Sequence, residues 1–127
     1  MRILLDTHVL LWMATGSSKL KSAARRLIDD PANDLTFSAV SIWEIAIKNS
    51  LGQASFSVDL TAFHKGLFAI GVTELPISSI HAAATEQLPT RHKDPFDRML
   101  IAQAQAEDMV LVSNEALFDG FAVKRLW

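Results

Sequence analysis

The chain alternates short apolar runs with longer amphipathic segments. Runs such as RILL, DLTFS and MVLVS are too short for buried helices and are rich in β-branched or aromatic residues, which favours buried strands. Strands are predicted at 2–5, 34–38, 72–77, 109–113 and 122–127.

The segments between these runs predict helices, most of which follow a capping residue. Ser17 or Ser18 is a candidate N-cap for a helix that turns Leu20, Ala24 and Leu27 inward and a basic face outward. Helices are predicted at 8–14, 19–30, 39–51, 60–71, 80–88 and 95–107, with Ser38, Asp59, Ser78 or Ser79, and Asp94 as the other candidate N-caps.

Strands that alternate with helices indicate an α/β fold. We expect one domain over residues 1–127, with a central parallel sheet of about four to five strands covered by helices on both faces. In such folds a site forms beyond the carboxyl ends of the strands. Residues that follow each predicted strand are therefore the first candidates for function.

Composition narrows the class of protein. Half of the 127 residues are apolar and 20% are charged, as in a compact globular domain. The absence of cysteine excludes disulfides and thiolate metal sites and fits a reducing compartment, so we expect a cytoplasmic protein. No run approaches the ~20 apolar residues that span a membrane. The four histidines lack the spacing of a zinc site, so packing or surface roles are favoured for them.

Four acidic residues fall where a site is expected. Asp6 follows the first predicted strand and Glu115 follows the run at 109–113, while Asp97 lies in the first turn of the helix that leads into that run. Glu44 and Asp97 share their helix faces with apolar residues, where an uncompensated carboxylate is costly. Convergent carboxylates repel one another, and a hard divalent cation such as Mg²⁺ or Mn²⁺ removes that repulsion.

Each acid also has a structural interpretation. Asp6 could close a turn, and Glu44 could complete a capping box with Ser41. Asp97 and Glu115 could each complement the dipole of a helix N-terminus. Only the conjunction of the four acids favours a metal site over these alternatives.

The same residues carry a family resemblance along the whole chain. ILLDTHVLLW, FSAVSIWEIAIK, HKDPFDRMLIAQA and LVSNEALF resemble, in order and spacing, the four motifs of PIN-domain nucleases, specifically the VapC-type toxins of bacterial toxin–antitoxin pairs. The resemblance implies a single PIN-like domain that is a Mg²⁺-dependent (or Mn²⁺-dependent) endoribonuclease toxin. It also implies a homodimer and a cognate antitoxin whose tail enters the active-site groove.

Residue roles follow from the resemblance. Asp6, Glu44 and Asp97 are expected to hold the metal, with Glu115 assisting catalysis. The fourth motif departs from the usual Thr-x-Asp, because Ser113 replaces the threonine and Glu115 the aspartate. Because of this departure, Glu115 is expected to act through water or from outside the set of metal ligands. Alternatively, Asn114 supplies the polar contact to the site. Thr7 and Ser113 are expected to orient ligands or waters, and Asp94 is expected to cap the helix and support the site.

Basic residues near these motifs are candidates for the RNA path. Lys48, Arg91, Lys93 and Arg98 are the candidates, although each is also explained as a solvated surface charge. Arg98 could instead pair with a neighbouring acid and orient it. The net charge of −2 lacks the strongly basic balance of nonspecific nucleic-acid binders.

Other functions stay open at this point. Asp6 at a strand end could accept a phosphoryl group, although the second aspartate expected two residues later is replaced by His8. A structure-specific DNA nuclease and a PIN-like binding module that has lost its chemistry are the further alternatives. Trp12, Trp43 and Trp127 are expected in the core or an interface, and the apolar segment 56–71 is expected to cover part of a partner.

Overall fold

A computed structural model of the chain describes residues 1–52 and 56–127. The strands in the described residues are β1 (Arg2–Leu5), β2 (Asp34–Ser38), β3 (Thr73–Leu75), β4 (Val110–Val112) and β5 (Arg125–Leu126). They form one five-stranded sheet in the order β3-β2-β1-β4-β5, and every neighbouring pair is parallel. The predicted α/β class and parallel sheet are therefore confirmed.

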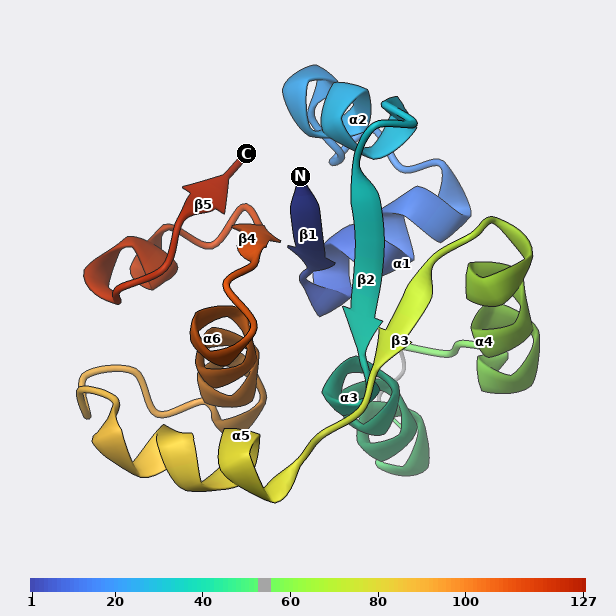
Figure 1. Cartoon of the computed structure of the whole chain (residues 1–127). Coiled ribbons are helices and arrows are strands. Elements are labelled where there is room, and N and C mark those ends of the chain that lie inside the picture. Colours follow the sequence, from blue (N-terminus) through green and yellow to red (C-terminus); the bar gives the residue numbers. More distant parts are fainter. Residues whose placement is uncertain (53–55) are drawn as a thin grey trace.

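Helices cover both faces of this sheet, as Figure 1 shows. They are α1 (Thr7–Thr15), α2 (Ser22–Asp29), α3 (Ala39–Ser50), α4 (Leu60–Ala69), α5 (Ser79–Ala84) and α6 (Pro95–Ala106), with the 3₁₀ turns η1 (Thr85–Gln87) and η2 (Ala116–Gly120). Across the described residues, no helix combines the length and apolarity needed to cross a membrane.

Two hydrophobic cores hold the layers together, one on each face of the sheet. Successive side chains of a strand point to opposite faces, so β1 contributes Leu4 to one core and Ile3 and Leu5 to the other. The Leu4 core includes residues of α3 and α6, and the opposite core includes residues of α1, α2 and α4. Full burial of each such side chain contributes about 1.5–3 kcal/mol, which fixes β1 in the centre of the sheet.

The second predicted helix begins later than its sequence pattern suggests. It starts at Ser22, and neither Ser17 nor Ser18 caps it. The reason lies in the end of α1, where Gly16 adopts the left-handed conformation at φ 64° and closes the preceding helix. The chain then makes a turn, so Leu20 is buried as predicted but from the segment before the helix.

Several other elements are shorter than predicted. Strand β3 ends at Leu75, before Pro76, which cannot donate to a sheet ladder. The predicted helix 80–88 is divided into α5 and η1, and the terminal strand is also shorter than its predicted segment. Ser78 caps α5 in a capping box with His81. The predicted caps Ser38, Asp59 and Asp94 are confirmed, each accepting a hydrogen bond from the first turn of its helix.

Candidate functional site

Two neighbouring strands bring polar residues to the same edge of the sheet. Strands β1 and β4 pair in parallel, so Asp6 after β1 and Ser113 after β4 emerge side by side. The Asp6 amide continues the ladder by donating to the Val112 carbonyl at 3.1 Å. The topology thus places the end of the first motif next to the fourth, which follows it by more than a hundred residues.

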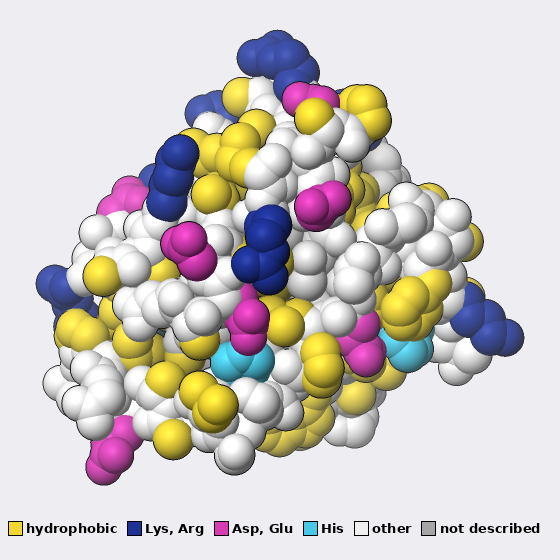
Figure 2. All heavy atoms as spheres, viewed as in Figure 1, with side chains coloured by type: hydrophobic (Ala, Val, Ile, Leu, Met, Phe, Trp, Pro, Cys, Tyr) yellow, Lys and Arg dark blue, Asp and Glu magenta, His cyan; other side chains and the backbone are white. Residues whose placement is uncertain are grey.

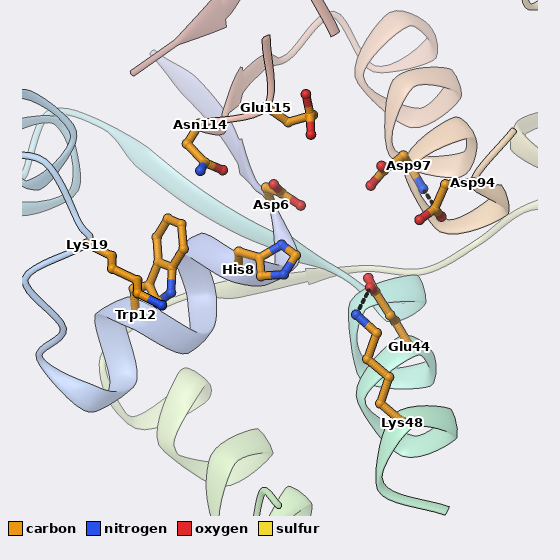
Figure 3. Close-up of a pocket in the computed structure, with 10 residues that line it drawn as sticks. All are labelled: Asp6, His8, Trp12, Lys19, Glu44, Lys48, Asp94, Asp97, Asn114 and Glu115. Carbon is orange, nitrogen blue, oxygen red and sulfur yellow. Dashed lines mark hydrogen bonds and ion pairs between the residues drawn. The ribbon is translucent and has the colours of Figure 1, made fainter. Parts of the chain in front are cut away.

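A cavity of about 380 Å³ opens at this edge. Its acidic side chains are Asp6, Glu44, Asp94, Asp97 and Glu115, which come from the ends of two strands and from α3 and α6. Figure 3 shows Asp6 near the centre, with Glu115, Asp97 and Glu44 around it. Two lysines, Lys19 and Lys48, also line the cavity, so five acids against two cations leave a formal charge of −3 when all are ionised.

Asp6 is the most deeply buried acid of the cavity, at 3% exposure. The Ser113 hydroxyl donates to its Oδ2 atom at 2.7 Å. Burial raises the pKa of Asp6 above its usual range, because the charged form loses water, and the Ser113 hydrogen bond offsets part of that rise. The Ser113 hydroxyl thus contacts one of the candidate acids directly.

Asp97 lies in the first turn of α6 with 20% of its side chain exposed. Burial raises its pKa to about 6, with a smaller opposing effect from a hydrogen bond to His92. Asp94 behaves differently, because it is exposed and its Oδ1 atom accepts from the backbone amides of Phe96 and Asp97 at 2.9 and 3.2 Å. Asp94 is therefore the cap of α6, and Asp97 is the half-buried acid of the cavity.

Glu44 projects from α3 with 6% of its side chain exposed. Its Oε2 atom pairs with the Lys48 ammonium at 2.8 Å, one helical turn away. The alternative capping box with Ser41 is wrong, because α3 begins earlier, at Ala39, and the Ser41 hydroxyl accepts from Thr7 at 2.8 Å. Leu51, seven residues after Glu44 and just beyond the end of α3, is 66% exposed.

Glu115 has a structural partner of its own. Its Oε1 atom accepts from the Leu117 amide at 3.0 Å, so the side chain caps η2. Its own amide donates to the Ser113 hydroxyl at 3.0 Å, which ties it to the Asp6–Ser113 pair. Glu115 and Asn114 both line the cavity.

The four predicted basic residues lie in three different places. Only Lys48 lines the acidic cavity, while Lys93 and Arg98 line a separate hollow of about 340 Å³ beside the exposed Trp43. Arg91 donates to the Gly120 carbonyl and lies over the Phe121 ring. Lysine and arginine side chains stand singly on the face shown in Figure 2, without a continuous basic surface.

Arg98 does not pair with an acid within the described residues, contrary to one expectation. Its guanidinium donates to the carbonyls of Thr85, Leu88, Pro89 and His92 at 2.6–3.2 Å. These four contacts fasten the loop before α6 to the first turn of that helix. Arg98 is therefore placed as a clamp on this loop.

Sequence reasoning missed the contact of His92 with Asp97. His92 lies in the loop before α6 and Asp97 in the first turn of that helix, so no helical or strand periodicity predicts that they meet. His8 and Trp12 also line the cavity, with ring centroids 5.8 Å apart. Trp43 is 57% exposed and packs edge-on against Phe96 with ring centroids 5.3 Å apart, so of its two expected places, the core or an interface, it is not in the core.

The carboxylates are near one another without touching. Within residues 1–52 and 56–127, no three His, Asp or Glu side chains are gathered closely enough to hold a metal ion as they stand. Like charges repel, and Glu44 turns to Lys48 instead.

The family model of the PIN domain matches residues 3–124. The chain belongs to the PIN domain family. The model covers β1 to the start of the terminal strand and therefore includes every acid of the cavity. Among curated proteins, none matches the chain at a significant level.

Solved structures share the fold of this PIN domain. A chain of VapBC2 from Rickettsia felis, bound to a promoter DNA fragment, is 16% identical with a TM-score of 0.73 and covers 99% of this chain and 98% of its own. A chain of DNA-bound VapBC from Salmonella typhimurium is 15% identical with a TM-score of 0.70, and the match covers 99% of this chain and 97% of the VapBC chain. A chain of a toxin–antitoxin complex from Klebsiella pneumoniae is 18% identical with a TM-score of 0.65, and the match covers 98% of this chain and 96% of the Klebsiella chain. At this identity the likeness shows the fold.

Proposed function

We propose that this PIN domain is a Mg²⁺-dependent (or Mn²⁺-dependent) endoribonuclease that acts as the toxin of a toxin–antitoxin pair in the cytoplasm. One observation carries the proposal. Asp6, Glu44 and Asp97 are buried or half-buried acids from three separate elements, and they line the same cavity. Stability of the fold alone does not explain three carboxylates in this cavity, because burying each of them costs desolvation free energy.

The donor set fits a hard divalent cation. All the candidate ligands are carboxylates, which suit Mg²⁺ or Mn²⁺. Burial raises the pKa of Asp6 and of Asp97, and neither has a lysine or arginine partner among the described residues. A bound cation offsets that cost and supplies an activated water and charge stabilisation for phosphodiester hydrolysis. Asp6, Glu44 and Asp97 are the residues that would hold it.

Neighbouring residues prepare these carboxylates. Ser113 holds one oxygen of Asp6 and leaves the other unengaged by side chains of the described residues. Thr7 donates to Ser41, which ties the start of α1 to the helix that carries Glu44. Glu115 caps η2 at the cavity wall, so we assign it an assisting role that acts through water.

Lys48 is the basic residue of the proposed RNA path that lines the cavity with the acids. Its ammonium pairs with Glu44, and the side chain is 30% exposed, so Lys48 can also face a phosphate that enters the cavity. Arg91 and Lys93 are exposed on the surface near the start of α6, and we assign them to a more distant part of the same path.

The toxin assignment draws support from relatives of the same fold. The structures named above are VapBC or toxin–antitoxin complexes, and they match this chain over nearly its full length. The segment 56–71 exposes Phe68 and Ile70 at 51% and 62%, as a surface covered by a partner would. We assign this surface to the cognate antitoxin, and the assembly to a homodimer or a toxin–antitoxin hetero-oligomer.

The test uses the purified chain on RNA with Mg²⁺, with and without EDTA. We expect cleavage that EDTA stops, and Asp6→Asn and Asp97→Asn are each expected to lose more than about 100-fold, because even residues that only support ligands cost about 10–100-fold. Asp94→Asn is the matched control, since asparagine caps a helix nearly as well as aspartate and this acid is exposed. Full activity in either Asp6→Asn or Asp97→Asn would sink the proposal.

Parallel substrates separate the alternatives. Cleavage of flap or hairpin DNA in preference to RNA would indicate a structure-specific DNA nuclease. Acid-labile phosphate on Asp6 would indicate phosphotransfer. A folded protein that binds neither Mg²⁺ nor Mn²⁺ would indicate a binding module. Co-purification with the product of a small neighbouring gene, together with growth arrest on expression alone, tests the toxin assignment.

A further inference from the structure

His92 lies in the loop between η1 and α6 and contacts an acid of the cavity. Its Nε2 atom is 2.8 Å from Oδ2 of Asp97. The imidazole is 14% exposed and the Asp97 side chain 20%, so the contact is largely shielded from water. An ionised carboxylate has no hydrogen to give, so Nε2 is the donor of this hydrogen bond.

Aromatic rings also contact the imidazole. The rings of Phe118 and Phe121 stand edge-on to His92, with centroids 6.2 and 6.3 Å away. Both phenylalanines are buried in the core that packs against α6. Because these rings restrict the orientation of the imidazole, its Nε2 atom is directed at Asp97 before any ligand arrives.

The backbone of His92 is held as firmly as its side chain. Arg98, the residue after Asp97, donates to the His92 carbonyl at 3.0 Å and to the carbonyls of Thr85 and Pro89 at 2.8 and 2.6 Å. Such charge-assisted hydrogen bonds are stronger than neutral ones. The loop is therefore fastened to the same helical turn that carries Asp97, so donor and acceptor keep their relative position.

The two buried aspartates of the cavity share this arrangement. Oδ2 of Asp6 accepts from Ser113, and Oδ2 of Asp97 accepts from His92. In each case one oxygen is fixed by a donor and the carboxylate is turned in a defined direction. Partners of this kind that orient a ligating carboxylate typically cost about 10–100-fold in metal affinity or activity when they are removed.

We propose that His92 is a positioning residue of the active site, which holds one oxygen of Asp97 so that the other faces the cation and the RNA in the cavity. This inference rests on the proposed function, because it assigns a direction to a carboxylate that the proposed function makes a ligand. His92 itself touches neither substrate nor cation. Its contribution is the hydrogen bond that it donates.

The experiment measures Mn²⁺ affinity by titration calorimetry on the full chain, at one fixed pH. The variants are His92→Leu, which keeps a similar volume without a donor, and His92→Gln, whose amide nitrogen lies close to the position of Nε2. We expect His92→Leu to lose about 10–100-fold in affinity and His92→Gln to stay close to the wild type. His64→Leu is the matched control, because His64 lies on α4, pairs with Glu74 of β3 and does not line the cavity. The Mn²⁺ affinity of this variant should not change.

Rescue by glutamine separates positioning from packing. Circular dichroism and the unfolding midpoint without metal show whether each variant folds, and His92→Asn, whose amide is too short to reach Asp97, replaces His92→Leu if the latter does not fold. Wild-type Mn²⁺ affinity in a folded variant that lacks the donor overturns the inference, as does a folded His92→Gln that is no better than His92→Leu. If the wild-type protein binds no Mn²⁺, the proposed metal site is wrong and the inference falls with it. If the wild type binds Mn²⁺ and only the His92 variants behave otherwise than expected, the inference alone is wrong.

Discussion

Replacing Asp97 with asparagine is expected to stabilise the metal-free protein near neutral pH, although it removes a proposed metal ligand. Burial raises the pKa of Asp97 from 3.8 to about 6. The folded state therefore binds this proton more tightly than the unfolded chain, and the ionised carboxylate costs folding free energy. Asparagine keeps an oxygen that accepts from His92 but carries no charge.

The magnitude follows from the size of the pKa difference. The rise of 6 − 3.8 = 2.2 units corresponds to about 3 kcal/mol, at about 1.36 kcal/mol per unit. The side chain is 20% exposed, so solvent screening lowers this value. Loss of the favourable charge at the N-terminus of α6 removes a further ~0.3–1 kcal/mol. The net gain in the free energy of unfolding is then about 1–2 kcal/mol.

The gain depends on pH in a defined direction. Below pH 3.8, Asp97 is protonated in both states, so its favourable contribution is fully present and asparagine gains nothing. As the pH rises from 3.8 to about 6, the wild type loses this contribution, and the advantage of the variant develops over the same window. Above that window the advantage is constant.

Urea unfolding in EDTA, followed by circular dichroism at about pH 4 and about pH 8, measures the effect. Asp94→Asn serves as control, because Asp94 is exposed and its capping bond is retained by asparagine. Added Mn²⁺ should raise the midpoint of the wild type and leave Asp97→Asn unchanged, since a ligand stabilises only the state that binds it. An Asp97→Asn variant no more stable than the wild type at about pH 8, or equally stabilised at both pH values, would refute the reasoning.

Two further changes probe the neighbours of the acids. Lys48→Met leaves the Glu44 carboxylate, which is 6% exposed, without its cation. In urea titrations this change should lower the free energy of unfolding by about 1–3 kcal/mol, whereas Lys48→Arg should keep most of the wild-type stability. Unchanged stability in Lys48→Met would contradict the pairing. Ser113→Ala removes the donor to Asp6 and should slow RNA cleavage by about 10–100-fold, while Ser113→Thr retains the hydroxyl and the rate. Equal rates in both Ser113 variants would show that the hydroxyl has no role in orienting Asp6.

Local rules predicted much of the fold. Caps such as Ser38 and Asp94 act through hydrogen bonds within a few residues, so their neighbours in the sequence suffice to identify them. The second helix was misplaced because two serines looked like caps, while Gly16 imposed a turn that the helical pattern did not reveal. The end of β3 likewise depends on where its neighbour β2 can still pair with it.

For the acids of the cavity, too, local sequence identified the residues but not all of their contacts. The sequence identified Asp6, Glu44, Asp97 and Glu115 as candidates, and the structure places all four on one cavity. The sequence did not reveal that His92 donates to Asp97, because that contact depends on the path of the loop before α6. The Glu44–Lys48 pair is local, four residues apart on α3, but Lys48 was expected on the RNA path instead. Arg98, for which an acid partner was one of two expectations, binds carbonyls of a loop whose path no periodic pattern predicts.

The sequence by itself determined the order of the strands and helices, most of their caps and the order of the acidic motifs, because periodicity and capping act over a few residues. Only the tertiary structure decided which oxygens of those acids are already engaged and which basic residues reach the cavity. The physical reason is that these contacts join segments far apart in the chain, as Ser113 and Asp6 do. Their geometry is set by the packing of β1 against β4 and of α6 against the sheet.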